Sequence, residues 1–214
     1  MNNIERYKQY RQTQVELHTK ILNEYVHEVD FKQAAYTLGI LNNQNKVVIE
    51  NEADYEALCD FNIYEKIRAG KNTLSLFAEN YPSENQVENE LIAAMLQSKA
   101  SLYEVIHVDK IEGVLMLNDI LGDLNKSVKI IDIGLSNSII SSALIYTRVL
   151  DLEGFSMTSG LGFVFFVNHK DYILNRSRKM IKKLKSGDTS VDNFITYFHL
   201  NRSDGLSTRF ENIK

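Results

Sequence analysis

The chain has 214 residues, 44% hydrophobic and 24% charged, which is the range of an ordinary globular protein with one large domain or two small ones. Its single cysteine, Cys59, excludes an intramolecular disulfide and a zinc site built from cysteines. The polar N-terminus and a longest apolar stretch of only eight residues, 160–167, predict neither a secretory signal nor a membrane-spanning helix.

We therefore expect a cytoplasmic protein with no membrane contact and no cofactor. A lone cysteine fits a reducing compartment, and frequent Asn, Lys and Ile are typical of AT-rich bacterial genomes. The net charge of −4 is unevenly spread, because residues 1–99 carry −5, residues 100–168 carry −4 and residues 169–214 carry +5. Such asymmetry is typical either of a basic binding segment or of two parts of one molecule that attract each other.

Apolar side chains recur at helical spacing in the first part of the chain. We expect helices over 4–29 and 31–41, and a third that begins at Asn51 and ends near Gly70. Asp54 follows Asn51 by three residues, the spacing of a helix cap. These patterns predict a mainly helical N-terminal region.

A short strand is expected at 46–50, between the second and third helices. Pro82 cannot lie inside a helix, so it separates the third helix from a fourth that Ser83 is expected to cap.

The pattern changes near residue 100 to short runs rich in β-branched and aromatic residues, with Gly, Asp and Asn turns between them. The runs cover residues 101–109, 114–119, 127–132, 142–150, 155–159 and 161–167. Strands this short need a closed arrangement that protects their edges, so we expect a small antiparallel β-barrel of about six strands, or a sandwich. The predicted fold class is α+β, with a helical region over 1–99, the barrel over 100–168, and a C-terminal basic helix and tail over 169–214.

The barrel segment resembles a small β-barrel region of uncharacterised bacterial proteins, some of which carry a C-terminal SEC-C zinc motif. The resemblance rests on hydrophobic and turn residues, namely Tyr103, Glu104, Val105, Asp119, Leu121, Leu152, Glu153, Gly154, Ser159 and Gly160. The zinc motif is absent from this sequence, since there is one cysteine. The resemblance implies a barrel and no particular activity.

None of the usual phosphate-binding, nucleophile or metal-helix motifs occurs in the sequence. One arrangement could still carry acid–base or metal chemistry: His107 alternates with Asp109 on one expected strand, and Asp119 is expected on the next. The alternative is an exposed histidine near turns, in which aspartates are ordinary turn formers.

The stretch 173–185 predicts an amphipathic helix that packs back on the protein. Its apolar residues cover about a third of the helix circumference, the width of a face docked on a globular core. Asn168 is expected to cap the helix and Gly187 to end it. The other side is cationic, with Arg176, Arg178, Lys179, Lys182, Lys183 and Lys185.

Three alternatives stay open for this cationic side: water and the protein's own acids, a nucleic acid, or an acidic protein partner. A membrane surface is disfavoured because the apolar face lacks aromatic anchors. The sequence pI of about 5.8 argues against nucleic acid, as does the lack of an aromatic residue among the cations from 173 to 185.

Our leading functional hypothesis is a non-enzymatic protein-interaction module that contacts a protein partner or a second copy of itself. The alternative is a nucleic-acid-binding accessory protein that uses residues 173–185. A third hypothesis is a metal-dependent enzyme centred on His107 and Asp119.

Overall fold

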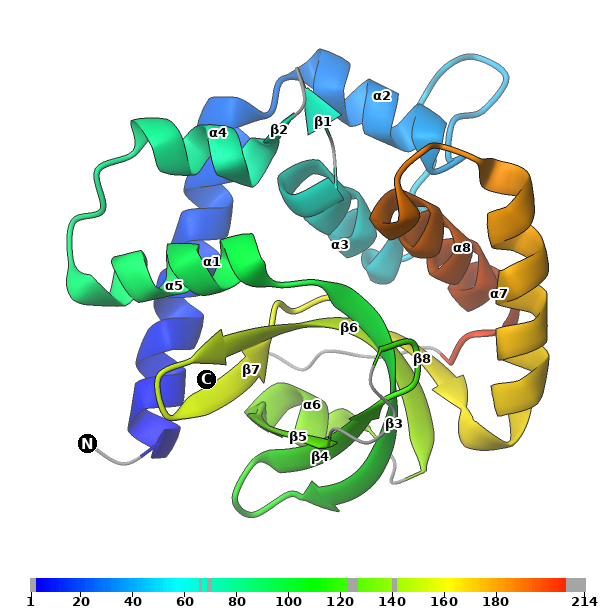
Figure 1. Ribbon diagram of the computed structural model, residues 1–214. Coiled ribbons are helices and arrows are strands. Elements are labelled where there is room, and N and C mark those ends of the chain that lie inside the picture. The colour runs from blue at the N-terminus through cyan, green and yellow to red at the C-terminus, as the bar shows by residue number, and fades with distance from the viewer. Residues whose placement is uncertain (1–2, 66, 69–70, 123–126, 140–141, 207–214) are drawn as a thin grey trace.

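The computed structural model describes residues 3–65, 67–68, 71–122, 127–139 and 142–206, and consists of helices packed around a small β-barrel (Figure 1). The elements before the barrel are α1 (Asn3–Tyr25), α2 (Glu28–Thr37), α3 (Glu52–Asp60), the π-helical turn η1 (Phe61–Glu65), β1 (Ile67–Arg68), β2 (Lys71–Asn72), α4 (Thr73–Asn80) and α5 (Gln86–Gln97). The barrel segment contains β3 (Ala100–Asp109), β4 (Val114–Asp119), β5 (Ser127–Ile131), α6 (Ile133–Ser138), β6 (Ala143–Leu152), β7 (Phe155–Thr158) and β8 (Phe163–Phe166). A 3-10 turn η2 (Val167–His169) then leads into α7 (Lys170–Leu184) and α8 (Thr189–Asp204).

Five strands close the barrel in the order β3-β4-β5-β7-β6, and β6 pairs back with β3. All neighbours are antiparallel except β5 and β7, which are parallel. The sixth strand, β8, lies outside this ring and pairs with β6. A helix, α6, connects the third and fourth strands of the ring. This strand order, with one parallel pair and a helix at that position, is the connectivity of OB-fold barrels.

The predicted α+β class and the predicted barrel are confirmed. All six expected strands form at positions close to those predicted. The expectation of a wholly antiparallel sheet needs one correction, because β5 and β7 run in parallel.

Strand β6 explains why the barrel and the helices form one core. Every residue from Ala143 to Leu150 is buried, so both faces of the strand are covered. Ala143, Ile145 and Val149 belong to the barrel interior, while Leu144 and its neighbours on the outer face pack against helices. Side chains of α6 also pack into the interior, close to the start of β4 and the end of β5.

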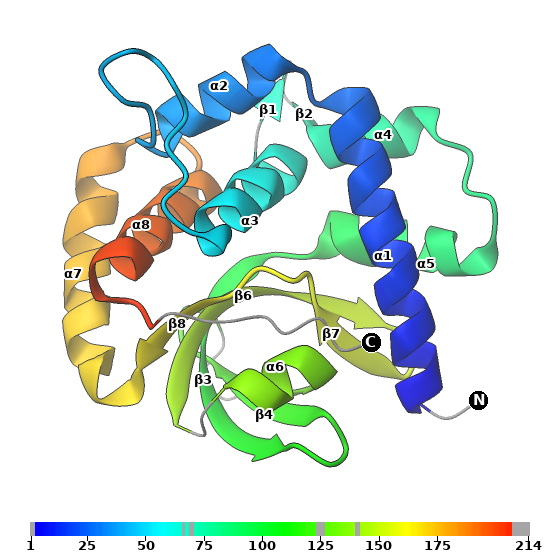
Figure 2. The same ribbon diagram turned by 180° about the vertical axis from the view of Figure 1, so that it is seen from behind.

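Helices cover the outer face of β6 in two groups. Helices α2, α3, α7 and α8 share one hydrophobic cluster with β6 and β8. Helices α1, α4 and α5 share a second with β6 and β7. Helices α1 and α7 run along opposite sides of the molecule, as the two views show (Figures 1 and 2).

A buried charge cluster joins the barrel to the helices. Arg148 on β6 is 2% exposed and forms ion pairs with Asp60 of α3 and Glu65 of the π-helical turn. A second pair joins Arg11 of α1 to Asp132 at the end of β5, with 2.7 Å between nitrogen and oxygen. These contacts fix both helical groups relative to the same barrel.

Several local expectations were wrong. The two helices expected over 4–29 and 31–41 do form, as α1 and α2, but each ends four residues earlier than predicted. The strand at 46–50 is replaced by an isolated bridge between Leu41 and Val47, and helices α4, α6 and α8 were not predicted. Asn51 does cap α3 through the amide of Asp54, as predicted. The helix ends at Asp60, however, and Gly70 lies outside the described residues.

The fourth expected helix, α5, begins at Gln86, and its cap is Asn85 and not Ser83. Helix α7 forms as expected, but its ends differ: η2 precedes it in place of an Asn168 cap, and the left-handed residue after it is Lys185, at φ 48°. None of the described helices has both the length and the apolar character needed to cross a lipid bilayer.

Candidate functional site: the outer face of α7 and the barrel mouth

Helix α7 is docked on α8 through a narrow buried strip. Ile173 and Ser177 are its buried residues, and the Tyr197 hydroxyl of α8 donates to the Ser177 hydroxyl at 3.3 Å. Leu174 and Met180 are partly buried against the same hydrophobic cluster. The opposite side of the helix faces outward along one side of the molecule (Figure 1).

Five of the six cations predicted on this helix are exposed: Arg178, Lys179, Lys182, Lys183 and Lys185. No ion pair joins any of them to an acid in the described part of the chain. The sixth, Arg176, pairs with Asp204 at the end of α8. Of the six predicted cations, therefore, one is neutralised by an ion pair with an acid in the described part of the protein.

Three exposed aromatic rings lie at or just before the N-terminal end of α7. The sequence analysis did not identify them. Phe166 is 43% and Tyr172 48% exposed, and His169 lies between them, with ring centroids 5.8 Å from Phe166 and 6.4 Å from Tyr172. Tyr172 precedes Arg176 by four residues and Lys179 by seven, so the ring and these two cations share one side of the helix. Tyr172 was missed because the segment considered for the basic helix began one residue later, at 173, and Phe166 and His169 lie before the helix.

The strand register separates the residues of the predicted acid–base or metal group. Asp119 lies opposite Tyr103, whereas His107 lies opposite Met116 and Asp109 opposite Val114. Tyr103 and His107 are four positions apart on β3, or about 13 Å at the usual strand rise.

Asp109 has a local role, since it accepts the amides of Ile111 and Glu112 in the turn, both at 3.0 Å. No three metal-ligating side chains gather anywhere in the described ranges. Of the three predicted residues, Asp119 borders a cavity.

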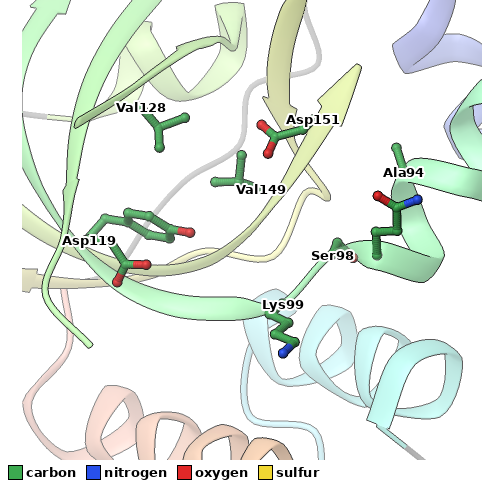
Figure 3. Close-up of a pocket in the computed structure, with 9 residues that line it drawn as sticks. Ala94, Ser98, Lys99, Asp119, Val128, Val149 and Asp151 are labelled. Atoms are coloured by element: carbon green, nitrogen blue, oxygen red, sulfur yellow. The ribbon is translucent and has the colours of Figure 1, made fainter. Parts of the chain in front are cut away.

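That cavity, which we call the barrel mouth, has a volume of about 270 Å³ and lies between the end of α5 and the barrel (Figure 3). It is at the opposite end of β4 and β5 from α6, because Asp119 ends β4 and Val128 lies near the start of β5. The lining residues are Ala94, Gln97, Ser98, Lys99, Tyr103, Asp119, Val128, Val149 and Asp151. It therefore combines an apolar floor with two carboxylates and a tyrosine.

The two carboxylates are held by neighbouring donors. Oδ1 of Asp119 accepts the amide of Gly122 at 2.9 Å and the hydroxyl of Ser101. Oδ1 of Asp151 accepts the hydroxyl of Ser156 at 2.7 Å. Burial raises the pKa of Tyr103, and the negative charges of the two carboxylates raise it further, so the phenol keeps its proton at neutral pH.

Comparison with known proteins gives a family but no activity. None of the curated proteins matches the chain, and none of the solved structures does. The resemblance to barrels that accompany a SEC-C motif is not found as a family match. A family model described as a family of unknown function, DUF7986, matches residues 1–211, and the chain belongs to that family.

Proposed function

We propose that this protein is a binding module that holds single-stranded nucleic acid on the outer face of α7. The observation that carries the proposal is the combination of five exposed, unpaired cations with the exposed rings of Phe166, His169 and Tyr172 on the described surface. Cations bind phosphates, and aromatic rings stack on bases of any sequence. The rings remove one argument that the sequence raised against nucleic acid.

The dimensions of α7 suit a short single strand. Tyr172 and Lys183 are eleven residues apart, which corresponds to about 16 Å along a helix. Lys179 lies between them on the same side. A strand lying along this face would meet rings at one end and cations at the other.

The barrel adds support by analogy alone, because OB-fold barrels often bind oligonucleotides. The outer sides of β4 and β5, the usual binding face of such barrels, carry Met116, Asn118 and Lys129 and no aromatic residue. We therefore place the binding surface on α7 and not on the barrel. A bacterial, cytoplasmic setting belongs to the same proposal, as does the expectation that the protein is a module and not an enzyme.

The test is the salt dependence of binding to a fluorescent 12-nucleotide single strand of DNA or RNA. Five phosphate contacts predict a slope of about −3.5 in log affinity against log salt, which is an affinity loss of about 100-fold between 50 and 200 mM salt. The variant Lys182→Glu plus Lys183→Glu should bind at least about tenfold more weakly at 50 mM and show a smaller slope.

The matched control is Lys8→Glu plus Lys110→Glu, which changes the net charge equally at two exposed lysines, one on α1 and one at the start of the β3–β4 turn. This control should bind like the unchanged protein. Equal weakening by both variants, or no binding at 50 mM salt, would contradict the proposal. A duplex that competes as well as the single strand would contradict the role of the rings.

A second candidate is the protein-interaction module that the sequence favoured. Val29 and Tyr36 on α2 are 73% and 75% exposed and lie seven residues apart, on the same side of the helix. Sedimentation equilibrium of the protein and of a Val29→Lys plus Tyr36→Lys variant tests self-association through this surface. A monomer at all concentrations, in both proteins, would exclude a homo-oligomer.

A further inference from the structure

The guanidinium of Arg176 is paired on one side and free on the other. Both of its contacts are made by one nitrogen, Nη1, which donates to the Tyr172 hydroxyl at 2.7 Å and to Oδ2 of Asp204. A guanidinium has five N–H groups, of which Nη1 carries two and Nε and Nη2 carry the other three. Those three have no hydrogen-bond partner among the residues that the structure describes.

The free edge of Arg176 suits an oxyanion. The N–H groups of Nε and Nη2 lie side by side and can donate to two oxygens of one phosphate or carboxylate, which a lysine cannot do. The side chain is 38% exposed, so an anion can reach this edge from solvent. The ion pair with Asp204 therefore leaves Arg176 able to bind a second anion.

The same ion pair holds the guanidinium in place. Asp204 ends α8 and also accepts the hydroxyl of Ser203 at 2.6 Å, so its carboxylate is itself fixed. Contacts with two residues reduce the freedom of Arg176 before any ligand arrives. Less conformational entropy is then lost on binding.

The carboxylate of Asp204 does not close the free edge to anions. It contacts Nη1, whereas the free donors are on Nε and Nη2. An anion bound at those donors is closer to the guanidinium than to the carboxylate, so its net Coulomb energy is attractive. The unpaired Lys179 follows Arg176 by three residues, on the same side of α7, and adds to this attraction.

An exposed ring lies beside the free edge. The central carbon of the Arg176 guanidinium is 5.7 Å from the ring centroid of Tyr172, and that side chain is 48% exposed. His169 meets the ring edge-on, at 73° between planes, so it does not cover a ring face by stacking. A base stacked on Tyr172 and a phosphate on Arg176 can therefore belong to one nucleotide.

We propose that Tyr172 and Arg176 form a subsite for one nucleotide, whose base stacks on the ring and whose phosphate accepts from Nε and Nη2. The ligand class is a nucleoside monophosphate unit, supplied by a strand or by a free nucleotide. The inference rests on the proposed function where the nucleotide belongs to a strand. It extends that function by giving a role to Arg176, the cation that an ion pair neutralises.

Titration of the full chain with adenosine monophosphate, followed by NMR, tests the proposal. The Nε signal of Arg176 and the ring signals of Tyr172 should shift together. Adenosine and ribose 5-phosphate, which each lack one half of the ligand, should bind at least about fivefold more weakly. The proposal is overturned if the nucleotide shifts neither signal, if ribose 5-phosphate binds as tightly, or if acetate displaces the nucleotide as well as inorganic phosphate does.

The variant Arg176→Lys keeps the charge and loses the bidentate edge. It should weaken binding of the nucleotide and of the 12-nucleotide strand by about tenfold or more, because charge-assisted hydrogen bonds are lost. The salt slope should not change, since the charge at this position is the same. Arg6→Lys is the matched control: Arg6 on α1 also lies over a tyrosine, 5.6 Å from the ring centroid of Tyr10, and the change should leave both affinities unchanged.

The two ligands separate this inference from the proposed function. Strand binding that is insensitive to Arg176→Lys would overturn the subsite and leave the proposed function standing. Nucleotide binding without strand binding would support the subsite as a site for a free nucleotide and would contradict the proposed function. Loss of both affinities in Arg176→Lys, with neither lost in Arg6→Lys, would support a subsite within the strand.

Discussion

The guanidinium of Arg148 lies over the ring of Tyr64, with 4.1 Å between its central carbon and the ring centroid. The same guanidinium pairs with Asp60 and Glu65, so one barrel side chain is enclosed by a ring and two carboxylates from the α3–η1 segment. The arrangement anchors this segment to β6, and the π-helical turn carries two of the three contacts.

Replacing Arg148 with methionine should destabilise the protein by about 3–5 kcal/mol at pH 7, because two buried carboxylates lose their cation. Urea unfolding measures the change. The triple variant Arg148→Met, Asp60→Asn, Glu65→Gln is the control and should recover much of the loss, since it leaves no buried charge at this position. A single variant within 1 kcal/mol of the unchanged protein would show that the cluster does not stabilise the fold.

Asp60 should make the protein less stable as the pH rises. Burial raises its pKa from 3.8 to about 6, with Glu65 acting in the same direction and Arg148 opposing. A raised pKa means that the folded state binds the proton more tightly. Its contribution is therefore complete below about pH 4 and is lost as the pH rises through about 6.

The shift corresponds to roughly 3 kcal/mol. The free energy of unfolding of the protein, relative to that of an Asp60→Asn variant, should fall by about this amount between pH 4 and pH 7. Urea denaturation at four pH values tests it. A constant difference between the two proteins would contradict the assignment.

His18 should act in the opposite direction. Its ring lies 2.9 Å from the Tyr64 hydroxyl, and burial lowers its pKa to about 4, helped by the charges of Arg11 and Arg148. The folded state favours the neutral ring, so the contribution is present above about pH 6.5 and is lost as the pH falls through about 4.

A His18→Gln variant should therefore lose less stability than the unchanged protein between pH 6.5 and pH 4, by roughly 2 kcal/mol after allowance for the partial exposure of the ring. Unfolding followed by circular dichroism at each pH is sufficient. Above pH 7 the free energies of unfolding of the two proteins should change with pH in parallel. If they also change in parallel down to pH 4, protonation of His18 does not destabilise the folded state.

Gly113 connects β3 and β4 where α6 packs against the barrel. Its φ is +64°, and an added Cβ would lie 2.9 Å from Cγ1 of Ile133. Gly113→Ala should destabilise the protein by about 1–3 kcal/mol. Gly134→Ala, inside α6 with an open environment, is the control and should be neutral or stabilising by up to about 1 kcal/mol. Equal melting temperatures for the two variants would contradict this account.

Tyr172→Ala should weaken binding of the single strand by about 5-fold to 100-fold, the usual range for the loss of one stacking ring. Tyr172→Phe is the control: it keeps the ring and loses the hydroxyl, which contacts Arg176 at 2.7 Å. The phenylalanine variant should bind like the unchanged protein. If both variants weaken binding equally, the hydroxyl and not the ring is responsible.

The sequence predicted the elements whose side chains repeat regularly. The strands from 101 to 167 and the docked face of α7 were found because burial on one side leaves a period of two or of 3.6 residues. Helix α6 was missed because it has only six residues and begins Ile-Gly-Leu-Ser, without an apolar stripe.

The buried cluster of Arg148 was unpredictable for a different reason. Its partners Asp60 and Glu65 are 88 and 83 residues away, and a charge inside an apolar strand gives no sign of which acids will neutralise it. Of the residues that line the barrel mouth, the sequence analysis proposed only Asp119 as a candidate. Tyr103 and Asp151 come close to it through strand register and barrel closure, which the residue pattern of one strand does not reveal.

Some contacts between α1 and the barrel can form only late in the synthesis of the chain. Arg11 donates to the carbonyl of Thr158 at 2.9 Å, and Gln14 donates to that of Ser159 at 2.9 Å, across 147 and 145 residues. These two contacts can form only after about three-quarters of the chain has been synthesised. A nascent chain that stalls before β7 can therefore pack α1 against α4 and α5 but lacks the contacts of α1 with β7, and such incompletely packed chains are what chaperones and proteases recognise.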